Sequence, residues 1–435
     1  MIGERERRVC EHIAQRQDEL VALLKALIGF DTVATDIGAS GGELGALQEL
    51  LAARLRESGA QVTVEEPDAA IAAGHPFAPD GFTFDGRPQL VARFAGDGGG
   101  GGRTLLLCGH VDVVSVEPRD AWSVDPFAGA VRDGSVYGRG SCDMKGGVAA
   151  MVFAAEALAE LGISLRGDLL VNTVSEEETT GAGGLVSART LRADAAIVPE
   201  PSALHVGIAC RGSLLATITV EGRAGHAGIA RRHHADGGAV NAVEKAAYVL
   251  EAIRRLNEEW TLRPPHPYLA PAECVTTAIH GGEWMVSHPA RCRIECHFEY
   301  LPGQADADGW GSIVEREFEA WIAGAAAADP WLREHPPRVE WLLGGVPPAE
   351  VDAHDPIVET LLAAHHDLGG NARLGGLDNW HDGATLILEG GIPAVNYGPG
   401  DIYLAHAVDE RVPIAELVAC AQGIAVAAMR FCSVA

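Results

Sequence analysis

Histidine and acidic residues occur at five separated places in this chain, each beside an apolar run or a glycine-rich turn. The positions are His110, Asp143, the acids at 176–178, Glu200 and His406. Imidazole and carboxylate ligands without cysteine suit zinc, with cobalt or manganese as substitutes, and such mixed sets leave room for water at a catalytic metal. Two ions that share one carboxylate lower the pKa of a bound water and polarise a carbonyl. The sequence therefore predicts a two-metal centre capable of hydrolysing amides.

The elements that must position these side chains are visible in the pattern. Apolar runs at 104–108, 168–174, 195–199 and 392–397 predict buried strands. Asp143 instead lies in a glycine-rich turn before an alanine-rich helix predicted at 146–161. Ligands of open α/β sheets bind beyond the carboxyl ends of the strands. We therefore expect one edge of one sheet to gather all five segments.

Two glycine-rich segments need separate interpretation. Residues 38–42 match the GxSxG pattern of serine hydrolases but lack a preceding strand and lead into a helix predicted at 43–59, so Ser40 is kept as an alternative nucleophile. Residues 98–102 are expected to form a hairpin tip between strands at 90–94 and 104–108, because neither a helix nor a lysine follows. A non-catalytic binding protein with a vestigial metal site is a further alternative.

The order of the motifs resembles the M20 group of dinuclear zinc amidohydrolases. This group contains acetylornithine deacetylase, succinyl-diaminopimelate desuccinylase, aminoacylase and carboxypeptidase G2. The motifs are GHVD, GRGSCDMKGG, the acids followed by TGAG, PEP, and a late GPG and AH, and they cover nearly the whole chain. The resemblance implies an α/β zinc-peptidase-like catalytic domain with a mixed, mostly parallel sheet. It also implies an inserted α+β, ferredoxin-like lid and dimerisation domain.

By this resemblance two zinc ions share Asp143. His110 and Glu200 would complete one site, and Glu178 and His406 the other. The Asp143–Met144 peptide would be cis, as in relatives.

The resemblance also implies the catalytic roles. Asp112 would orient His110, and Glu177 would be the general base. Setting 180–183 against the family's TGxG selects this register, whereas a shift by one residue would make Glu176 the base and Glu177 the ligand.

The insert shows its own pattern of strands at 213–221 and 291–300 around a helix predicted at 238–258. We place the catalytic domain at residues 1–209 and 326–435 and the lid at 210–325. His226 in the lid resembles the family's histidine that reaches a partner's active site in dimers and stabilises the oxyanion. The resemblance thus implies a homodimer formed through the lid.

Substrate contacts are expected from three residues. Tyr300 stands near the place where many relatives carry an arginine that grips the substrate's α-carboxylate, and a phenol lacks that bidentate, charged geometry. Asp382 lies in the segment NWHDG, which is expected to line a substrate pocket or to pack through its tryptophan, and Gly398 begins the GPG turn. The leading substrate is an N-acyl amino acid of the acetylornithine type, and a dipeptidase or carboxypeptidase activity is second.

The composition limits partners and compartment. The chain has 435 residues, 47% of them apolar, and no apolar stretch long enough to cross a membrane. Lys and Arg number 33 against 60 acids, and the net charge of −27 disfavours nucleic acid and anionic membrane as partners. The charged amino-terminal segment has no signal core, and nine scattered cysteines without CxxC favour reduced thiols. We therefore expect a cytoplasmic enzyme whose partner is a small N-acyl amino acid or peptide.

Overall fold

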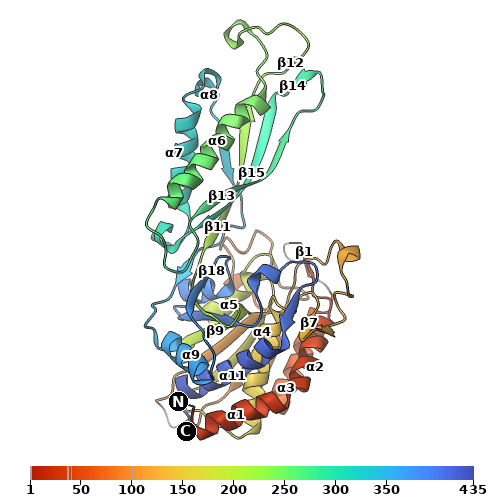
Figure 1. Cartoon of the computed structure of the whole chain (residues 1–435), viewed down its shortest axis with the longest axis vertical. Helices are drawn as coiled ribbons and strands as arrows, with labels where there is room; N and C mark the ends of the chain where they lie inside the picture. The colour runs from red at the N-terminus through yellow and green to blue at the C-terminus, as the bar shows by residue number, and fades with distance from the viewer. Residues whose placement is uncertain (1, 37–38, 41, 99–100) are drawn as a thin grey trace. The chain divides into compact units, whose positions relative to one another are not determined.

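The structure is a computed structural model that describes residues 2–36, 39–40, 42–98 and 101–435, with only the backbone described at 35–36 and 39–40. The chain divides into two compact units (Figure 1). Unit 1 comprises residues 1–209, 350–377 and 381–435, and unit 2 comprises 210–349 and 378–380.

The boundary at the end of unit 2 lies at residue 349, later than the predicted residue 325. Helix α8 (Pro330–Glu334) and strand β16 (Arg338–Trp341) belong to unit 2. The reason is that β16 pairs with the strand at 212–221, and Trp331 of α8 is buried in the core of unit 2.

Unit 1 is built on a mixed sheet. In sheet order its main strands are β17 (Ala349–Glu350), β10 (Val206–Cys210), β19 (Ala394–Gly398), β9 (Ala195–Pro201), β5 (Leu105–His110), β8 (Leu169–Val174), β4 (Gln89–Phe94) and β3 (Gln61–Glu65), and β18 (Leu374–Leu377) pairs with β10. The four central strands, β19, β9, β5 and β8, run parallel. Strands β10, β4 and β3 pair antiparallel to their neighbours. The mixed sheet with a parallel centre agrees with the predicted fold class.

The predicted hairpin between β4 and β5 is wrong. Strand β8 lies between them, parallel to β5 and antiparallel to β4. Every residue of β5 and β8 is buried, so these two strands take the centre, whereas β4 exposes part of one face and takes an outer place. Parallel neighbours need a crossover connection, and the helix after β5 supplies it. Residues 99 and 100 of the predicted tip lie outside the described residues.

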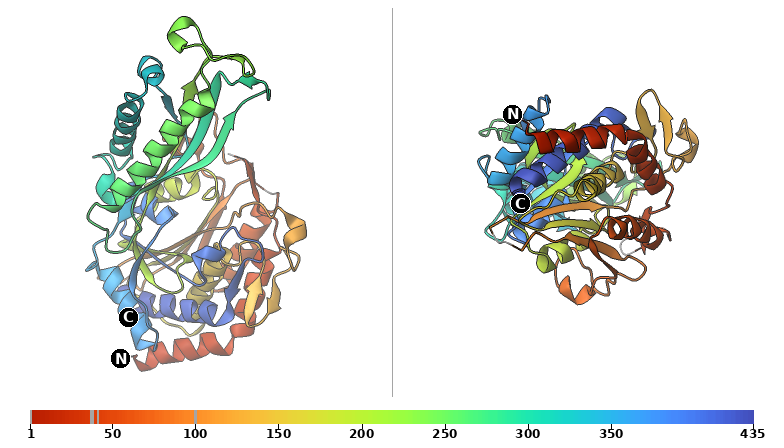
Figure 2. Two further views of the ribbon diagram at one scale, coloured as in Figure 1. Left: turned by 45° about the horizontal axis from the view of Figure 1, so that its top comes forward. Right: turned by 90° about the horizontal axis from the view of Figure 1, so that it is seen from below.

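Helices cover both faces of this sheet (Figure 2). The helices of one layer are α1 (Glu4–Gln15), α2 (Gln17–Ile28), α3 (Leu44–Glu57), α4 (Lys145–Glu160), α9 (Pro356–Asp367) and α11 (Ile414–Phe431). The other face carries α5 (Ala182–Thr190) and α10 (Asp382–Leu388). Within the described residues α11 alone is long and apolar enough to cross a membrane, yet 67% of it is buried against α1, α4, α9 and their neighbours.

Two small sheets complete unit 1. Strands β6 (Ala130–Arg132), β7 (Ser135–Tyr137) and β20 (Arg411–Pro413) form an antiparallel sheet, which holds the segment before Asp143 beside the segment after His406. Strands β1 (Ala34–Asp36) and β2 (Ala39–Ser40) form a short pair. The side chain of Ser40 lies outside the described residues, so the serine-hydrolase alternative stays untested there.

Unit 2 is a four-stranded antiparallel sheet covered on one face by two helices. The strands in order are β13 (Glu273–Gly281), β15 (Arg291–Tyr300), β11 (Gly212–Glu221) and β16, and the helices are α6 (Ala242–Thr261) and α7 (Ser312–Ala326). Alternate residues of β15 point into the core under these helices, as a period of two requires. Two short strands, β12 (Gly225–His226) and β14 (Ser287–His288), pair at one end.

Candidate metal centre

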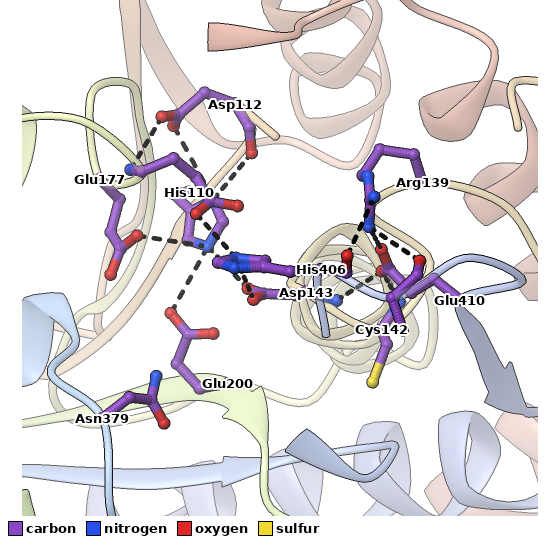
Figure 3. Close-up of polar contacts among 12 residues, drawn as sticks. His110, Asp112, Arg139, Cys142, Asp143, Glu177, Glu200, Asn379, His406 and Glu410 are labelled. Carbon is purple, nitrogen blue, oxygen red and sulfur yellow. Dashed lines mark hydrogen bonds and ion pairs between the residues drawn. The ribbon is translucent and has the colours of Figure 1, made fainter. Parts of the chain in front are cut away.

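The five predicted segments converge in unit 1 (Figure 3). His110 ends β5, the acids at 176–178 follow β8, and Glu200 lies near the end of β9. These three strands are parallel neighbours, so their carboxyl ends meet at one edge of the sheet. Asp143 lies directly before α4, and His406 comes from a loop after β19, beyond unit 2 in the chain. The structure thus brings together predicted ligands that are separated by up to 296 positions.

The first group surrounds the imidazole of His110. Its Nε2 lies 3.1 Å from Oδ1 of Asp143 and 3.6 Å from Oε1 of Glu200. His110 is 1% exposed and the two carboxyl side chains are also buried. These are the three residues that the resemblance assigned to one metal.

The second group surrounds the imidazole of His406. Its Nε2 lies 3.0 Å from Oε2 of Glu178 and 3.3 Å from Oδ2 of Asp143. The two oxygens of Asp143 therefore face different imidazoles, Oδ1 toward His110 and Oδ2 toward His406. A carboxylate in this arrangement can bridge two ions. The Asp143–Met144 peptide is cis, as the resemblance predicted.

The donor set fits cations. Oε1 of Glu178 and Oε1 of Glu200 are buried and have no hydrogen-bond partner among the described residues, although buried polar atoms normally have one. Burial, reinforced by neighbouring carboxylates, raises the pKa of Glu177 and Glu200 well above the usual range. Contacts with Asp143 and Glu178 raise the pKa of His406 to about 10. Metal cations bound here would neutralise the crowded carboxylates and replace the protons on the imidazole nitrogens.

The three glutamates at 176–178 have different surroundings. The carboxylate of Glu176 turns away from the centre, lies 3.0 Å from Nη1 of Arg87 and accepts from Oγ1 of Thr179 at 2.8 Å. Both side chains of that ion pair are 2% exposed. This placement favours the register with Glu177 as base over the alternative with Glu176. Glu177 remains beside the ligands, with Oε2 3.9 Å from Nε2 of His110, and its side chain is 11% exposed.

Asp112 holds His110 in a different way from the prediction. Nδ1 of His110 lies 2.9 Å from the main-chain oxygen of Asp112, whereas Oδ1 of the carboxylate lies 3.8 Å away. The other carboxylate oxygen accepts a hydrogen bond from the main-chain N–H of Glu178 at 3.1 Å. Asp112 thus orients the imidazole through its carbonyl, and its side chain fixes the loop that carries the acids.

The structure gives packing roles to two of the three residues predicted to contact the substrate, Tyr300 and Gly398. Tyr300 is fully buried in the core of unit 2, where its hydroxyl donates to the carbonyl of Val346 at 3.3 Å. Gly398 is also buried, and a Cβ there would lie 2.2 Å from the carbonyl oxygen of Pro199, so its role is close packing of β19 on β9. Its N–H and carbonyl are both used within the chain. Asp382 is 1% exposed at the start of α10, and neither of its carboxylate oxygens has a hydrogen-bond partner among the described residues, so its contact with a substrate stays a prediction.

His226 lies on β12 in unit 2, and its ring is exposed. The main-chain N–H of Gly228 donates to Nδ1 of His226 at 3.0 Å. In the neutral ring the proton must then be on Nε2, which becomes a hydrogen-bond donor. This tautomer suits the predicted contact with an oxyanion, and the contact itself stays a prediction.

A buried ion pair next to the centre, between Arg139 and Glu410, was not predicted from the sequence. Nη1 of Arg139 lies 2.6 Å from Oε2 of Glu410, and both side chains are at most 3% exposed. The only local signals were an arginine inside the GRG turn and an acid four residues after His406.

Known proteins share sequence and fold with this chain. The model for "Peptidase family M20/M25/M40" matches residues 106–430. The N-formyl-4-amino-5-aminomethyl-2-methylpyrimidine deformylase of Bacillus subtilis (strain 168) is 29% identical over 423 residues, which cover 93% of each chain. The acetylornithine deacetylase of Photorhabdus laumondii is 28% identical over 405 residues, which cover 90% of this chain and 92% of the deacetylase.

A solved structure shares the fold. The dipeptidase Dug1p from Saccharomyces cerevisiae superposes with a TM-score of 0.72 over 98% of each chain, at 14% identity. The likeness to Dug1p concerns the fold, whereas the family model spans most of the chain and all five ligand segments. On these grounds the chain belongs to peptidase family M20/M25/M40, a family of metal-dependent amide hydrolases.

Proposed function

We propose that this protein is a zinc-dependent amidohydrolase that removes a small acyl group from the nitrogen of a small molecule. The observation that carries the proposal is the placement of Asp143, whose two oxygens face the imidazoles of His110 and His406 while Glu177 lies alongside. His110, Asp143 and Glu200 would hold one ion, and Asp143, Glu178 and His406 the other.

The substrate we propose carries an N-formyl or N-acetyl group and lacks a free α-carboxylate. Tyr300 was the residue expected to hold that carboxylate, and it is buried in the core of unit 2. The loss of this contact favours an N-formylated amine, of the kind named for the Bacillus subtilis deformylase, over N-acetylornithine.

Glu177 is the proposed general base. Two zinc ions bound here would lower the pKa of a water molecule and polarise the acyl carbonyl. The Glu177 carboxylate takes a proton from the attacking water as the C–O bond forms, and it returns that proton to the amine nitrogen as the C–N bond breaks.

We further propose a cytoplasmic homodimer in which Nε2–H of the partner's His226 stabilises the oxyanion of the tetrahedral intermediate. The fixed Nε2–H tautomer of the His226 ring supports this role. All nine cysteines are free and buried, which supports a reducing compartment.

The test is an assay of chelator-treated protein before and after zinc or cobalt is restored. The panel contains an N-formylaminopyrimidine, N-formyl and N-acetyl amino acids, and dipeptides. We expect chelation to abolish hydrolysis, zinc to restore it, and the N-formylaminopyrimidine to be hydrolysed at least tenfold faster than the amino-acid derivatives. Activity that survives chelation but is lost on treatment with a fluorophosphonate would instead support the serine-hydrolase alternative.

A further inference from the structure

We propose that Arg139 and Glu410 are positioning residues that set the spacing of the two metal sites by holding the main chain at Asp143 and at His406. The proposal rests on the metal centre of the proposed function, and it does not depend on the identity of the substrate. Neither residue is among the ligands, and neither side chain faces the centre directly (Figure 3).

The carboxylate of Glu410 binds the main chain at Asp143, the proposed bridging ligand. Its Oε1 accepts hydrogen bonds from the main-chain N–H groups of Cys142 and Asp143, at 2.8 and 3.0 Å. Its Oε2 accepts from Arg139 at 2.6 Å. Because Asp143 precedes the first turn of α4, its N–H has no partner in the helix. Glu410 supplies that partner and fixes the direction from which the Asp143 side chain leaves the chain.

The guanidinium of Arg139 holds the other two segments. Its Nη2 donates to the carbonyl of His406 at 3.4 Å, and its Nη1 donates to the carbonyl of Ala407 at 3.3 Å. Its Nε and Nη2 also donate to the carbonyl of Ser115, at 3.2 and 2.9 Å, just after the segment of His110. One buried ion pair therefore joins three of the segments that carry ligands.

His406 needs this support more than the other ligands do. Its φ is 59°, in the left-handed region that residues other than glycine rarely adopt. Its side chain is 54% exposed, so packing contributes little to its position. The bonds from Arg139 to the carbonyls at 406 and 407 act on the peptide groups that define this conformation.

Stability alone does not explain the pair. A buried ion pair is often no more stabilising than apolar residues of the same size, because both charges lose their hydration. Arg54 and Glu156 provide a comparison in the same unit, with a bidentate contact at 2.9 and 2.6 Å and Glu156 3% exposed. That pair joins α3 to α4 and makes no contact with a segment that carries a ligand. It is the matched control.

The experiment compares the full-length variants Glu410→Gln and Glu156→Gln with the wild type. Zinc affinity is measured by competition with a chromophoric chelator, and the resistance of the metal-free protein to urea is measured in parallel. We expect Glu410→Gln to weaken zinc binding about 10- to 100-fold, the range found when groups that orient metal ligands are removed. We expect Glu156→Gln to lower resistance to urea and to keep zinc affinity within twofold of wild type.

Arg139→Lys is the second variant, in case Glu410→Gln fails to fold. Lysine keeps the charge but lacks the planar fork that reaches three carbonyls. We expect weaker zinc binding and an altered visible spectrum of the cobalt-substituted protein, together with a moderate loss of resistance to urea from the carbonyls left without a donor.

The proposal is overturned if both Glu410→Gln and Arg139→Lys bind zinc like the wild type. A wild type that binds zinc but hydrolyses none of the proposed amides would refute the function and leave the positioning role standing. A wild type that binds no zinc would overturn both.

Discussion

Replacing each acid of the 176–178 triplet with glutamine is expected to cause three different losses. Glu177→Gln keeps the size of the side chain but cannot carry a proton. General acid–base groups typically contribute 10²- to 10⁴-fold, so we expect kcat to fall by that factor, an increase of about 3 to 5 kcal/mol in the barrier. Zinc content and resistance to urea should stay at wild-type values, because the carboxylate of Glu177 is not needed for either.

The variants at Glu178 and Glu176 are expected to lose different properties, zinc affinity in the first and stability in the second. Glu178→Gln removes a charge 3.0 Å from the imidazole of His406 and should lower zinc affinity at the second site. Glu176→Gln leaves the guanidinium of Arg87 buried without its ion-pair partner, a change that usually costs 3 to 5 kcal/mol. We expect about 3 kcal/mol here, because the 3.0 Å approach of Nη1 lacks hydrogen-bond alignment.

The assays are steady-state kinetics, zinc analysis after dialysis, and urea denaturation of the metal-free protein. The reasoning fails if Glu176→Gln removes activity without lowering stability, since that pattern would make Glu176 the base. It also fails if Glu177→Gln loses zinc and Glu178→Gln retains it. Glu177→Asp is the control for side-chain length, because it keeps the carboxylate that carries the proton and shortens the side chain.

Three further predictions follow from buried residues. Gly398→Ala should destabilise unit 1 by about 3 kcal/mol in urea denaturation, because the added methyl overlaps the backbone of β9, and wild-type stability would contradict the assigned packing role. Tyr300→Phe should lose one hydrogen bond, about 1 kcal/mol, with KM unchanged, whereas a raised KM would restore the substrate role. Burial lowers the pKa of His381 to about 4, below the 6.5 of the unfolded chain, so the unfolded state binds the extra proton between these values and stability falls as the pH drops through that window. By pH 5 this residue should cost about 2 kcal/mol, which His381→Asn should abolish when urea curves at pH 7.5 and pH 5 are compared.

The strands that deliver ligands were predictable because their sequences are apolar on both faces. The run before His110, the run before the glutamates and the run before Glu200 all form strands within two residues of the predicted bounds. Such runs indicate central strands, and the residues that end them lie at one edge. Local pattern was sufficient to place His110, the glutamates and Glu200 at strand ends, whereas the full ligand set, with Asp143 and His406, came from the family resemblance.

The order of strands was not predictable in the same way. Insertion of β8 between β4 and β5 depends on pairing between segments far apart in sequence, which no local pattern records. The outward and inward faces of β15 were predictable, because Cys296 and Phe298 alternate with polar residues and Tyr300 continues the apolar set. This two-residue alternation places Tyr300 on the buried face of β15, which the predicted substrate role did not take into account.

Arg139 and Glu410 could not be found from the sequence. They are single charged residues in loops, 271 positions apart, and the carbonyls and N–H groups that they bind carry no sequence signal. Their role is visible only when the segments of the main chain are placed beside one another.

Unit 2 separates Glu200 from His406 in the sequence, and this separation delays completion of the site during synthesis. A ribosome that adds 5 to 20 residues per second needs roughly 10 to 40 s to proceed from Glu200 to His406. Throughout this interval the nascent polypeptide carries all three proposed acidic ligands and a single imidazole, so the proposed two-metal site cannot be completed. Hydrolytic activity therefore appears only after the inserted unit has been translated.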